Sequence, residues 1–195
     1  MPGKLFLYFV LASFFLIIIF MQLNCSNNSQ EMSNDAMVTK GAHLVQVLHC
    51  DNCHSPKIIT ADGMVTDSTR RLAGHWGTDT IPNVDAKPVT SGKWILSSVD
   101  FNTWIGPWGV SFPANLTPDK PTGLGNWSAE VFMNALRNNK HMGMGRALLP
   151  PMSKLSYGHL TDDELKAIFA YLKTLPPVRN KVPEPIPPDK LSSLK

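Results

Sequence analysis

The sequence has little of what several large classes of protein require. Only three of its 195 residues are cysteine, so the two cysteine pairs of a zinc ribbon are missing. Lysine and arginine outnumber aspartate and glutamate by only 18 to 15, and no long basic run occurs, so nothing indicates nucleic-acid binding. Gly123-Leu124-Gly125 lacks the third glycine and the preceding strand of a dinucleotide-binding loop. One closely spaced cysteine pair remains as the most informative feature.

That pair belongs to a CxxCH motif, Cys50-Asp51-Asn52-Cys53-His54. Two thiols separated by two residues on a short helical turn can each add to one vinyl group of a haem, and the adjacent imidazole then lies over the iron. Thioredoxin-like enzymes and zinc sites also use CxxC, but the chain has no βαβ pattern around it and only Cys25 besides. The motif predicts one covalently attached haem c per chain, with thioether bonds at Cys50 and Cys53 and His54 as the proximal ligand.

The residue on the other face of the iron decides whether the iron carries electrons or binds ligands, and methionine and histidine are the usual candidates. Met152 follows Pro150-Pro151, whose fixed φ angles favour an extended loop over a helix. We therefore expect Met152 to be the distal ligand. The alternatives are an open iron, a histidine-ligated iron, or another of the side chains downstream of the motif, namely Met142, Met144, His141 and His159.

The N-terminus carries an uncharged apolar run from Leu5 to Met21, which predicts an export signal or a membrane anchor. Cys25 follows this run and precedes a polar stretch, as in a bacterial lipoprotein signal, although Leu23 and Asn24 are not the usual small residues. We expect an exported domain on the periplasmic side of a bacterial membrane, held there by a lipid on Cys25 or by the N-terminal helix.

Composition divides the chain into four parts. We expect a signal peptide or anchor at 1–24, a polar tether at 25–36, one haem-binding domain at 37–178 and a proline-rich tail at 179–195 that runs extended over the surface.

Three segments of the domain have the apolar spacing of amphipathic helices. Asp35 is expected to cap the first helix, which leads into the CxxCH motif, and Ser128 to open the second. Thr161 is expected to begin the third with a capping box, and Pro176-Pro177 to end it. The stretch between the motif and Ser128 has weak periodicity, which indicates loops. We expect its tryptophans to keep water off the haem: Trp76, Trp94, Trp104 and Trp108.

Several motifs occur along residues 40–178 in the order seen in a known family: Gly41, Leu44, CxxCHSP at 50–56, 115–119, 122–128, Gly145-Arg146, Leu149-Pro150-Pro151-Met152, Tyr157, 160–164, 170–173 and 175–178. In these motifs the chain resembles monohaem class I c-type cytochrome domains, in particular those of the cytochrome subunits of membrane-bound alcohol and gluconate dehydrogenases. The resemblance implies an all-α class I cytochrome c fold. In that fold the first and last helices cross over a buried haem with axial His54 and Met152, here with a long loop-rich insertion between them.

The chain departs from that family at three points. The dehydrogenase subunits have three haem domains, whereas this chain has one CxxCH motif and would be a single relay. His43 stands where the family tends to have tyrosine, and Ser153 follows Met152 where a proline and an aromatic residue are common. The resemblance therefore does not imply that this chain has the dehydrogenase partner of that family.

These observations favour an electron carrier that cycles between Fe(II) and Fe(III) over an enzyme. A thioether ligand raises the reduction potential relative to a bis-histidine site. The expected partners are redox proteins, with a membrane dehydrogenase and a terminal oxidase as candidates, and not nucleic acid. The rival interpretations are a haem oxidoreductase of the peroxidase or thiosulfate-oxidising type and a gas-binding sensor. Both need an open iron, and the nearby His141 and Arg146 are explained as surface or propionate partners.

Overall fold

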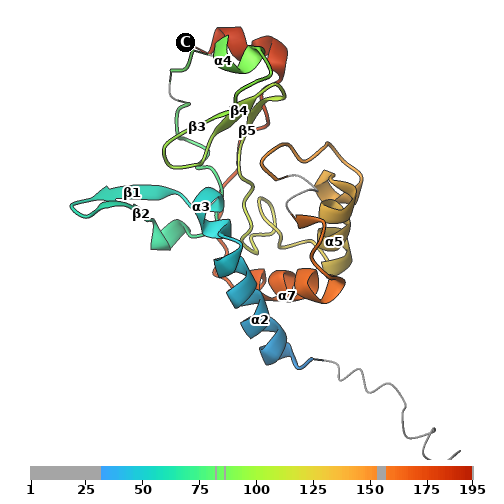
Figure 1. The fold of residues 1–195 in the computed structure, drawn as a ribbon. Coiled ribbons are helices and arrows are strands. Elements are labelled where there is room, and N and C mark those ends of the chain that lie inside the picture. The colour runs from blue at the N-terminus through green and yellow to red at the C-terminus, as the bar shows by residue number, and fades with distance from the viewer. Residues whose placement is uncertain (1–31, 82, 86, 153–156, 195) are drawn as a thin grey trace, which may run out of the picture. The chain divides into compact units, whose positions relative to one another are not determined.

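The computed structural model describes residues 32–81, 83–85, 87–152 and 157–194 (Figure 1). The chain divides into two units, residues 1–33 and residues 34–195. Cys25 and the apolar run at 5–21 lie outside the described residues, so the lipid and the anchor remain predictions. Within the described ranges, no helix is long and apolar enough to cross a bilayer.

Three helices frame the unit formed by residues 34–195: α2 (Asn34–Val47), α5 (Ala129–Asn138) and α7 (Asp162–Leu172). Two of them begin as predicted. The Ser128 hydroxyl accepts a hydrogen bond from the Val131 N–H at the start of α5, and Thr161 and Glu164 form a complete capping box on α7. The first helix begins two residues earlier than expected, at Asn34 and not at Ala36, because Asp35 lies in its first turn and not at its cap.

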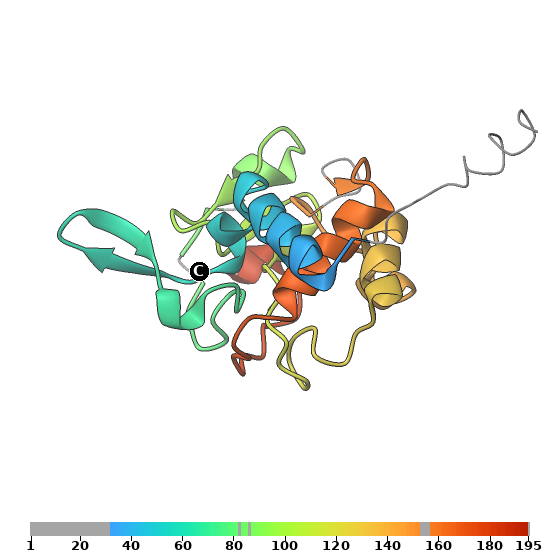
Figure 2. The ribbon, with the colours of Figure 1, turned by 90° about the horizontal axis from the view of Figure 1, so that it is seen from below.

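Helices α2 and α7 pack directly against each other (Figures 1 and 2). Their backbones touch at Gly41, where an added Cβ would lie 1.9 Å from the carbonyl oxygen of Ala167. The contact brings the apolar faces of α2, α5 and α7 together with two loop residues in one core. Its buried members are Val45, Leu72, Leu124, Phe132, Leu165, Ile168, Phe169 and Leu172.

The segment between the CxxCH motif and α5 contains two antiparallel sheets, so the predicted all-α class is wrong. Strands β1 (Lys57–Thr60) and β2 (Gly63–Thr66) form a hairpin, and β3 (Leu96–Ser97), β4 (Trp104–Gly106) and β5 (Gly109–Ser111) form a sheet in that order. The β1–β2 run is rich in Ile, Val and Thr on both sides of the two-residue turn Ala61-Asp62, which favours a hairpin. Strands of two to four residues are too short to show a period in the sequence.

The three-stranded sheet shares a second, smaller core with the end of the chain. Ile186 pairs with Val110 of β5, and the short 3₁₀ helix η3 (Pro188–Ser193) places Leu191 among Val89, Ile105 and Val110. Val89 comes from the short helix α4 (Lys87–Thr90). The segment after residue 178 is therefore packed into the described unit through this core.

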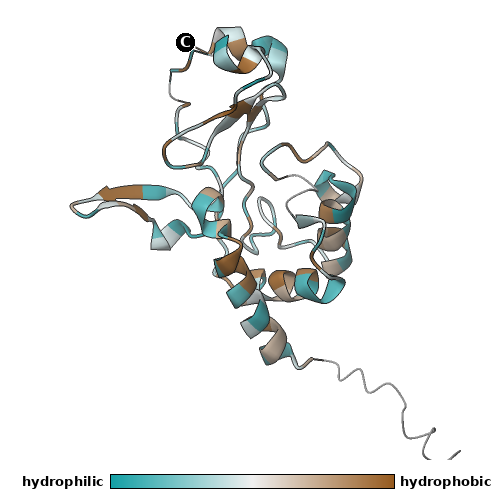
Figure 3. Ribbon diagram, in the orientation of Figure 1, coloured by the Kyte–Doolittle hydropathy of each residue, from teal (hydrophilic) through white to brown (hydrophobic). Residues whose placement is uncertain are grey.

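The β1–β2 hairpin projects from the rest of the unit and carries apolar residues along β1 (Figure 3). Ile59 is 85% exposed. The short helix η1 (Ser68–Arg70) follows the hairpin and starts at Asp67, whose side chain caps it by accepting the Thr69 N–H. The chain then returns to the core at Leu72.

Replacing Gly41 with alanine tests the contact between α2 and α7. Alanine favours a helix by itself, but its Cβ has no room against the Ala167 carbonyl, which belongs to a backbone and cannot turn aside. We expect Gly41→Ala to lower the free energy of unfolding by about 1–3 kcal/mol, as overpacking does. Denaturant unfolding of the full chain measures this change in the free energy of unfolding. The control is His43→Ala on the exposed face of α2. Equal stability of both variants would contradict the close approach.

Candidate functional site

The CxxCH motif folds as the short helix α3 (Cys50–His54), which follows α2 after two residues. The second of these, His49, has the left-handed conformation (φ 55°). Ser55 follows the motif, and its extended backbone lets the chain leave the helix at once. Cys50 and Cys53 are unpaired thiols, each partly buried. The short helical turn predicted from the sequence therefore forms, and it carries two thiols and one imidazole.

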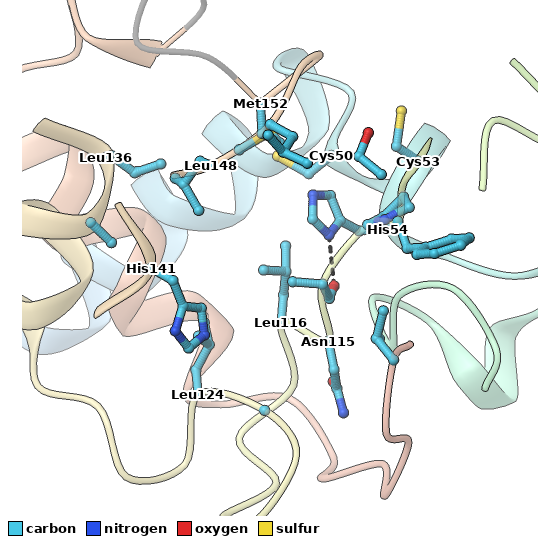
Figure 4. A pocket seen from close by; sticks show the side chains of 18 of the residues that line it. Cys50, Cys53, His54, Asn115, Leu116, Leu124, Leu136, His141, Leu148 and Met152 are labelled. Carbon is cyan, nitrogen blue, oxygen red and sulfur yellow. Dashed lines mark hydrogen bonds between the residues drawn. The ribbon is translucent and has the colours of Figure 1, made fainter. Parts of the chain in front are cut away.

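The His54 imidazole has one ring nitrogen in use and one free. Its side chain is buried, and Nδ1 lies 2.8 Å from the carbonyl oxygen of Ala114 (Figure 4). Because a carbonyl only accepts, Nδ1 carries the proton, and Nε2 presents its lone pair. Nε2 is buried without a hydrogen-bond partner among the described residues. Burial lowers the pKa of His54 against the opposing effect of the Ala114 hydrogen bond, so the ring is neutral at pH 7.

His54 and both cysteines line a cavity of about 420 Å³ (Figure 4). The cavity lies against all three long helices, which contribute Val45, Phe132 and Ile168 to its wall. Loop residues complete it, among them Leu116, Leu124 and Leu148. These six side chains are apolar, whereas polar side chains such as Ser111, Tyr157 and His141 line other parts of the cavity.

Met152 lines the same cavity, on a loop held by a hydrogen bond from Ser111 Oγ to the Pro150 carbonyl (2.7 Å). The peptide bond between Pro150 and Pro151 is cis. Met142 and Met144, at 48% and 85% exposure, do not line the cavity. The structure thus brings Met152 together with the motif and leaves the two alternative methionines outside.

The two histidine alternatives are placed differently. His141 lines the cavity on the side away from Cys53 (Figure 4), and burial and the neighbouring Arg146 lower its pKa. His159 is exposed and does not line it. The residue after Met152, Ser153, lies outside the described residues.

Of the tryptophans expected to shield the site, Trp104 lines the cavity, and Trp127, which the sequence reasoning missed, does so as well. Trp94 is 65% exposed. Trp76 lies beneath the Arg70 guanidinium, 4.7 Å from its ring centroid, outside the cavity.

A polar cluster outside the cavity holds the motif. Asp51 accepts hydrogen bonds from Ser55 Oγ (2.8 Å) and Arg71 Nη2 (2.6 Å), and Arg71 Nη1 donates to the Tyr171 hydroxyl (2.6 Å). The cluster thus ties α3 to α7. Sequence reasoning missed it because Arg71 lies 20 residues from one partner and 100 from the other, beyond any local pattern.

The segment 181–185 forms another part of the cavity wall that the sequence did not indicate. It is held by Asn180, whose side-chain amide donates to the carbonyls of Ala73 (2.8 Å) and His75 (2.7 Å). The Asn115 amide donates to the Val178 carbonyl (2.8 Å) just before it. Asn115 belongs to the 115–119 motif, for which the sequence predicted no contact with this segment.

The two thiols are not prepared for thiolate chemistry. Burial and the Asp51 carboxylate raise the pKa of Cys50 to about 11, and burial raises the pKa of Cys53. A thioredoxin-like cysteine reacts as a thiolate with a lowered pKa. Among the described residues, no three His, Cys, Asp or Glu side chains come together as a metal-binding group. The raised thiol pKa values therefore disfavour a thioredoxin-like use of CxxC.

Comparison with known proteins gives a consistent set of relatives, and no family model matches the chain. A subunit of nicotinate dehydrogenase from Pseudomonas putida is 36% identical over 95 residues, which make up 49% of the chain and 8% of that protein. The gluconate 2-dehydrogenase cytochrome c subunit of Pantoea cypripedii is 27% identical over 143 residues, or 73% of the chain and 24% of the relative. The fructose dehydrogenase cytochrome subunit of Gluconobacter japonicus is 38% identical over 68 residues, or 35% and 14%.

The chain thus spans a quarter or less of each of these relatives. Several of them are cytochrome subunits of dehydrogenases. This likeness agrees with the cytochrome c-like resemblance of the sequence.

Removing the Arg71 guanidinium tests the cluster that holds the motif. Arg71→Leu leaves the Asp51 carboxylate and the Tyr171 hydroxyl without their shared donor, at a cost of about 1–2 kcal/mol for a partly exposed group. The control is Arg179→Leu at an exposed position. A double-mutant cycle of Arg71→Leu with Asp51→Asn, read by denaturant unfolding, is expected to show coupling, and additive effects would exclude a direct interaction.

Proposed function

We propose that the chain is an electron-transfer protein with one c-type haem, bound through Cys50 and Cys53 and ligated by His54 and Met152. The observation that carries this proposal is the buried, unpaired lone pair of His54 Nε2 in an apolar cavity shared with two thiols and a methionine sulfur. These residues fit a haem, because the cavity supplies two covalent anchors and two iron ligands. A bound haem would supply a one-electron Fe(II)/Fe(III) couple.

The chain's own residues set the conditions for that couple. The Ala114 carbonyl fixes the His54 tautomer and so keeps Nε2 available as a ligand. Met152 provides a weak thioether donor, which favours the reduced state relative to a second histidine. The apolar side chains around His54 make its surroundings less polar than water, which further disfavours the more highly charged oxidised state.

The relatives also suggest which kind of protein exchanges electrons with this chain. Because several of them are cytochrome subunits of dehydrogenases, we propose a redox enzyme of that kind as the electron donor, with a terminal oxidase as the other candidate partner. With a single CxxCH motif, this chain would relay one electron at a time. We further propose that it works at the periplasmic face of a bacterial membrane, tethered through residues 5–21 or through a lipid on Cys25.

The intact mass of the full chain tests the attachment and the tether together. Produced with a cytochrome c maturation system, the chain is expected to keep one haem through acid extraction, because thioether bonds survive it. Replacing Cys50 and Cys53 together with alanine should release the haem. The third cysteine gives the matched control: Cys25→Ala should keep the haem and lose any acyl mass.

Three results would contradict these proposals. Stoichiometric zinc without covalent haem would exclude the haem site. A mature chain that begins beyond Cys25 without acyl mass would exclude both tethers. A chain that retains residues 5–21 would exclude the lipid and support the anchor.

Replacing Met152 with alanine tests the electron-carrier function. The loss of the sixth ligand should abolish the methionine-to-iron charge-transfer band, let the ferrous protein bind carbon monoxide and lower the reduction potential by on the order of 0.1 V, a fraction of the span that axial ligands cover. Optical spectra and a redox titration measure these changes. Met142→Ala is the control, since that side chain is half-exposed and outside the cavity. Rapid binding of carbon monoxide by the unmodified protein would instead support a haem oxidoreductase or a gas sensor.

A further inference from the structure

The loop at 98–104 is fastened to the end of the CxxCH motif. Asn102 is buried, and its side-chain amide donates to the Ser55 carbonyl (3.3 Å), next to His54. Its backbone carbonyl accepts from Nδ1 of buried His75 (2.9 Å). Inside the loop, the Ser98 N–H donates to the Thr103 carbonyl (2.9 Å). The motif therefore fixes the position of this loop.

Phe101, beside that anchor, has an unfavourable backbone conformation for its type. Its φ angle is 59°, in the left-handed region, where glycine, asparagine or aspartate would be less strained. Its side chain is 43% exposed, so burial in the core does not explain the aromatic residue. A strained residue held at the surface is typical of a functional position.

Trp104 connects Phe101 to the cavity. The Trp104 and Cys53 side chains both line the cavity, and the Trp104 indole N–H donates to the Phe101 carbonyl oxygen at 2.8 Å. The rings of Phe101 and Trp104 are stacked, with centroids 5.9 Å apart and planes 25° apart. The two rings form a continuous aromatic path from Cys53 to the surface.

The charged groups beside this pair are occupied within the protein. The Asp100 carboxylate accepts hydrogen bonds from Ser98 Oγ and from the Asn102 N–H. Lys57 Nζ donates to the carbonyls of Asp51 (2.8 Å) and Ser55 (2.7 Å). The neighbouring Val99 is 82% exposed. Both groups keep their charges, but these are of opposite sign, so together they add no net charge beside Phe101 and the exposed Val99 that would steer a partner.

We propose that the Phe101–Trp104 pair is the point at which an electron enters and leaves this protein, through contact with a redox protein whose own centre lies under an apolar surface. This inference rests on the proposed function, because the electron is that of a haem bound at Cys53. One electron passes from a reduced iron to an oxidised iron. No bond forms or breaks, and no proton has to move.

A second copy of the chain in the opposite redox state is the probe. Electron self-exchange between ferrous and ferric full-length protein, measured by NMR line broadening of the haem resonances, should not depend on ionic strength. Phe101→Asp, which suits the left-handed backbone, should slow self-exchange at least about tenfold at low salt because two like charges meet, and salt should restore part of the rate. Phe101→Leu should slow self-exchange less than Phe101→Asp and show no recovery with salt, because it removes the ring but adds no charge.

Met144→Asp is the matched control. Met144 is 85% exposed and follows the one-turn helix η2 (His141–Gly143), and His141 lies on the side of the cavity away from Cys53 (Figure 4). The Met144→Asp substitution introduces the same charge at the other side of the site. The self-exchange rate should remain within about twofold of that of the unmodified protein.

Two kinds of failure are distinguishable. If Met144→Asp slows self-exchange as much as Phe101→Asp does, or if only Met144→Asp slows it, electrons do not leave through the Phe101–Trp104 pair and the inference is wrong. If Phe101→Asp has normal covalent haem and an unchanged rate, the inference is also wrong, while the proposed function stands. Absence of covalent haem in the unmodified chain would overturn the proposed function itself.

Discussion

The contact of the α2 and α7 backbones at Gly41 is the constraint on which the rest of the structure depends. Because no side chain separates the two helices there, Val45 of α2 and Ile168 and Leu172 of α7 reach the same cavity. Helix α2 leads into the CxxCH motif after a two-residue turn, so the angle of the crossing also sets the position of His54. A larger separation would move the motif away from the wall that encloses it.

The sequence predicted those parts of the molecule that depend on local pattern. Ser128 and Thr161 begin their helices as expected, because a cap is a contact over three residues. The all-α prediction failed because β3, β4 and β5 have only two or three residues each and owe their existence to the second core around Val110. For the site, the motif and Met152 could be named from spacing and from the flanking prolines, and the structure brings them to one cavity. The roles of the Ala114 carbonyl and the Arg71 guanidinium could not be predicted from the sequence. A carbonyl has no sequence signature, and Arg71 meets its partners only in the folded chain.

The motif is held from three directions by groups of different kinds. Arg71 ties Asp51 to α7, the Ala114 carbonyl fixes the imidazole, and Asn102 fastens the 98–104 loop to Ser55. Two of these three contacts use backbone carbonyls, which stay in place when side chains change conformation. A rigid surround of this kind reduces the rearrangement that a change of charge at the site would cause, and a small rearrangement is what rapid electron exchange requires.

The segment 181–185 closes one side of the cavity, although it is synthesised well after the motif. In an unfolded chain that side of the site lacks its wall, and both thiols are accessible to a large planar group. Folding then encloses them, because the Asn115 and Asn180 side chains fasten the segment in place. Access to the thiols from that side therefore depends on whether this late segment of the chain has docked.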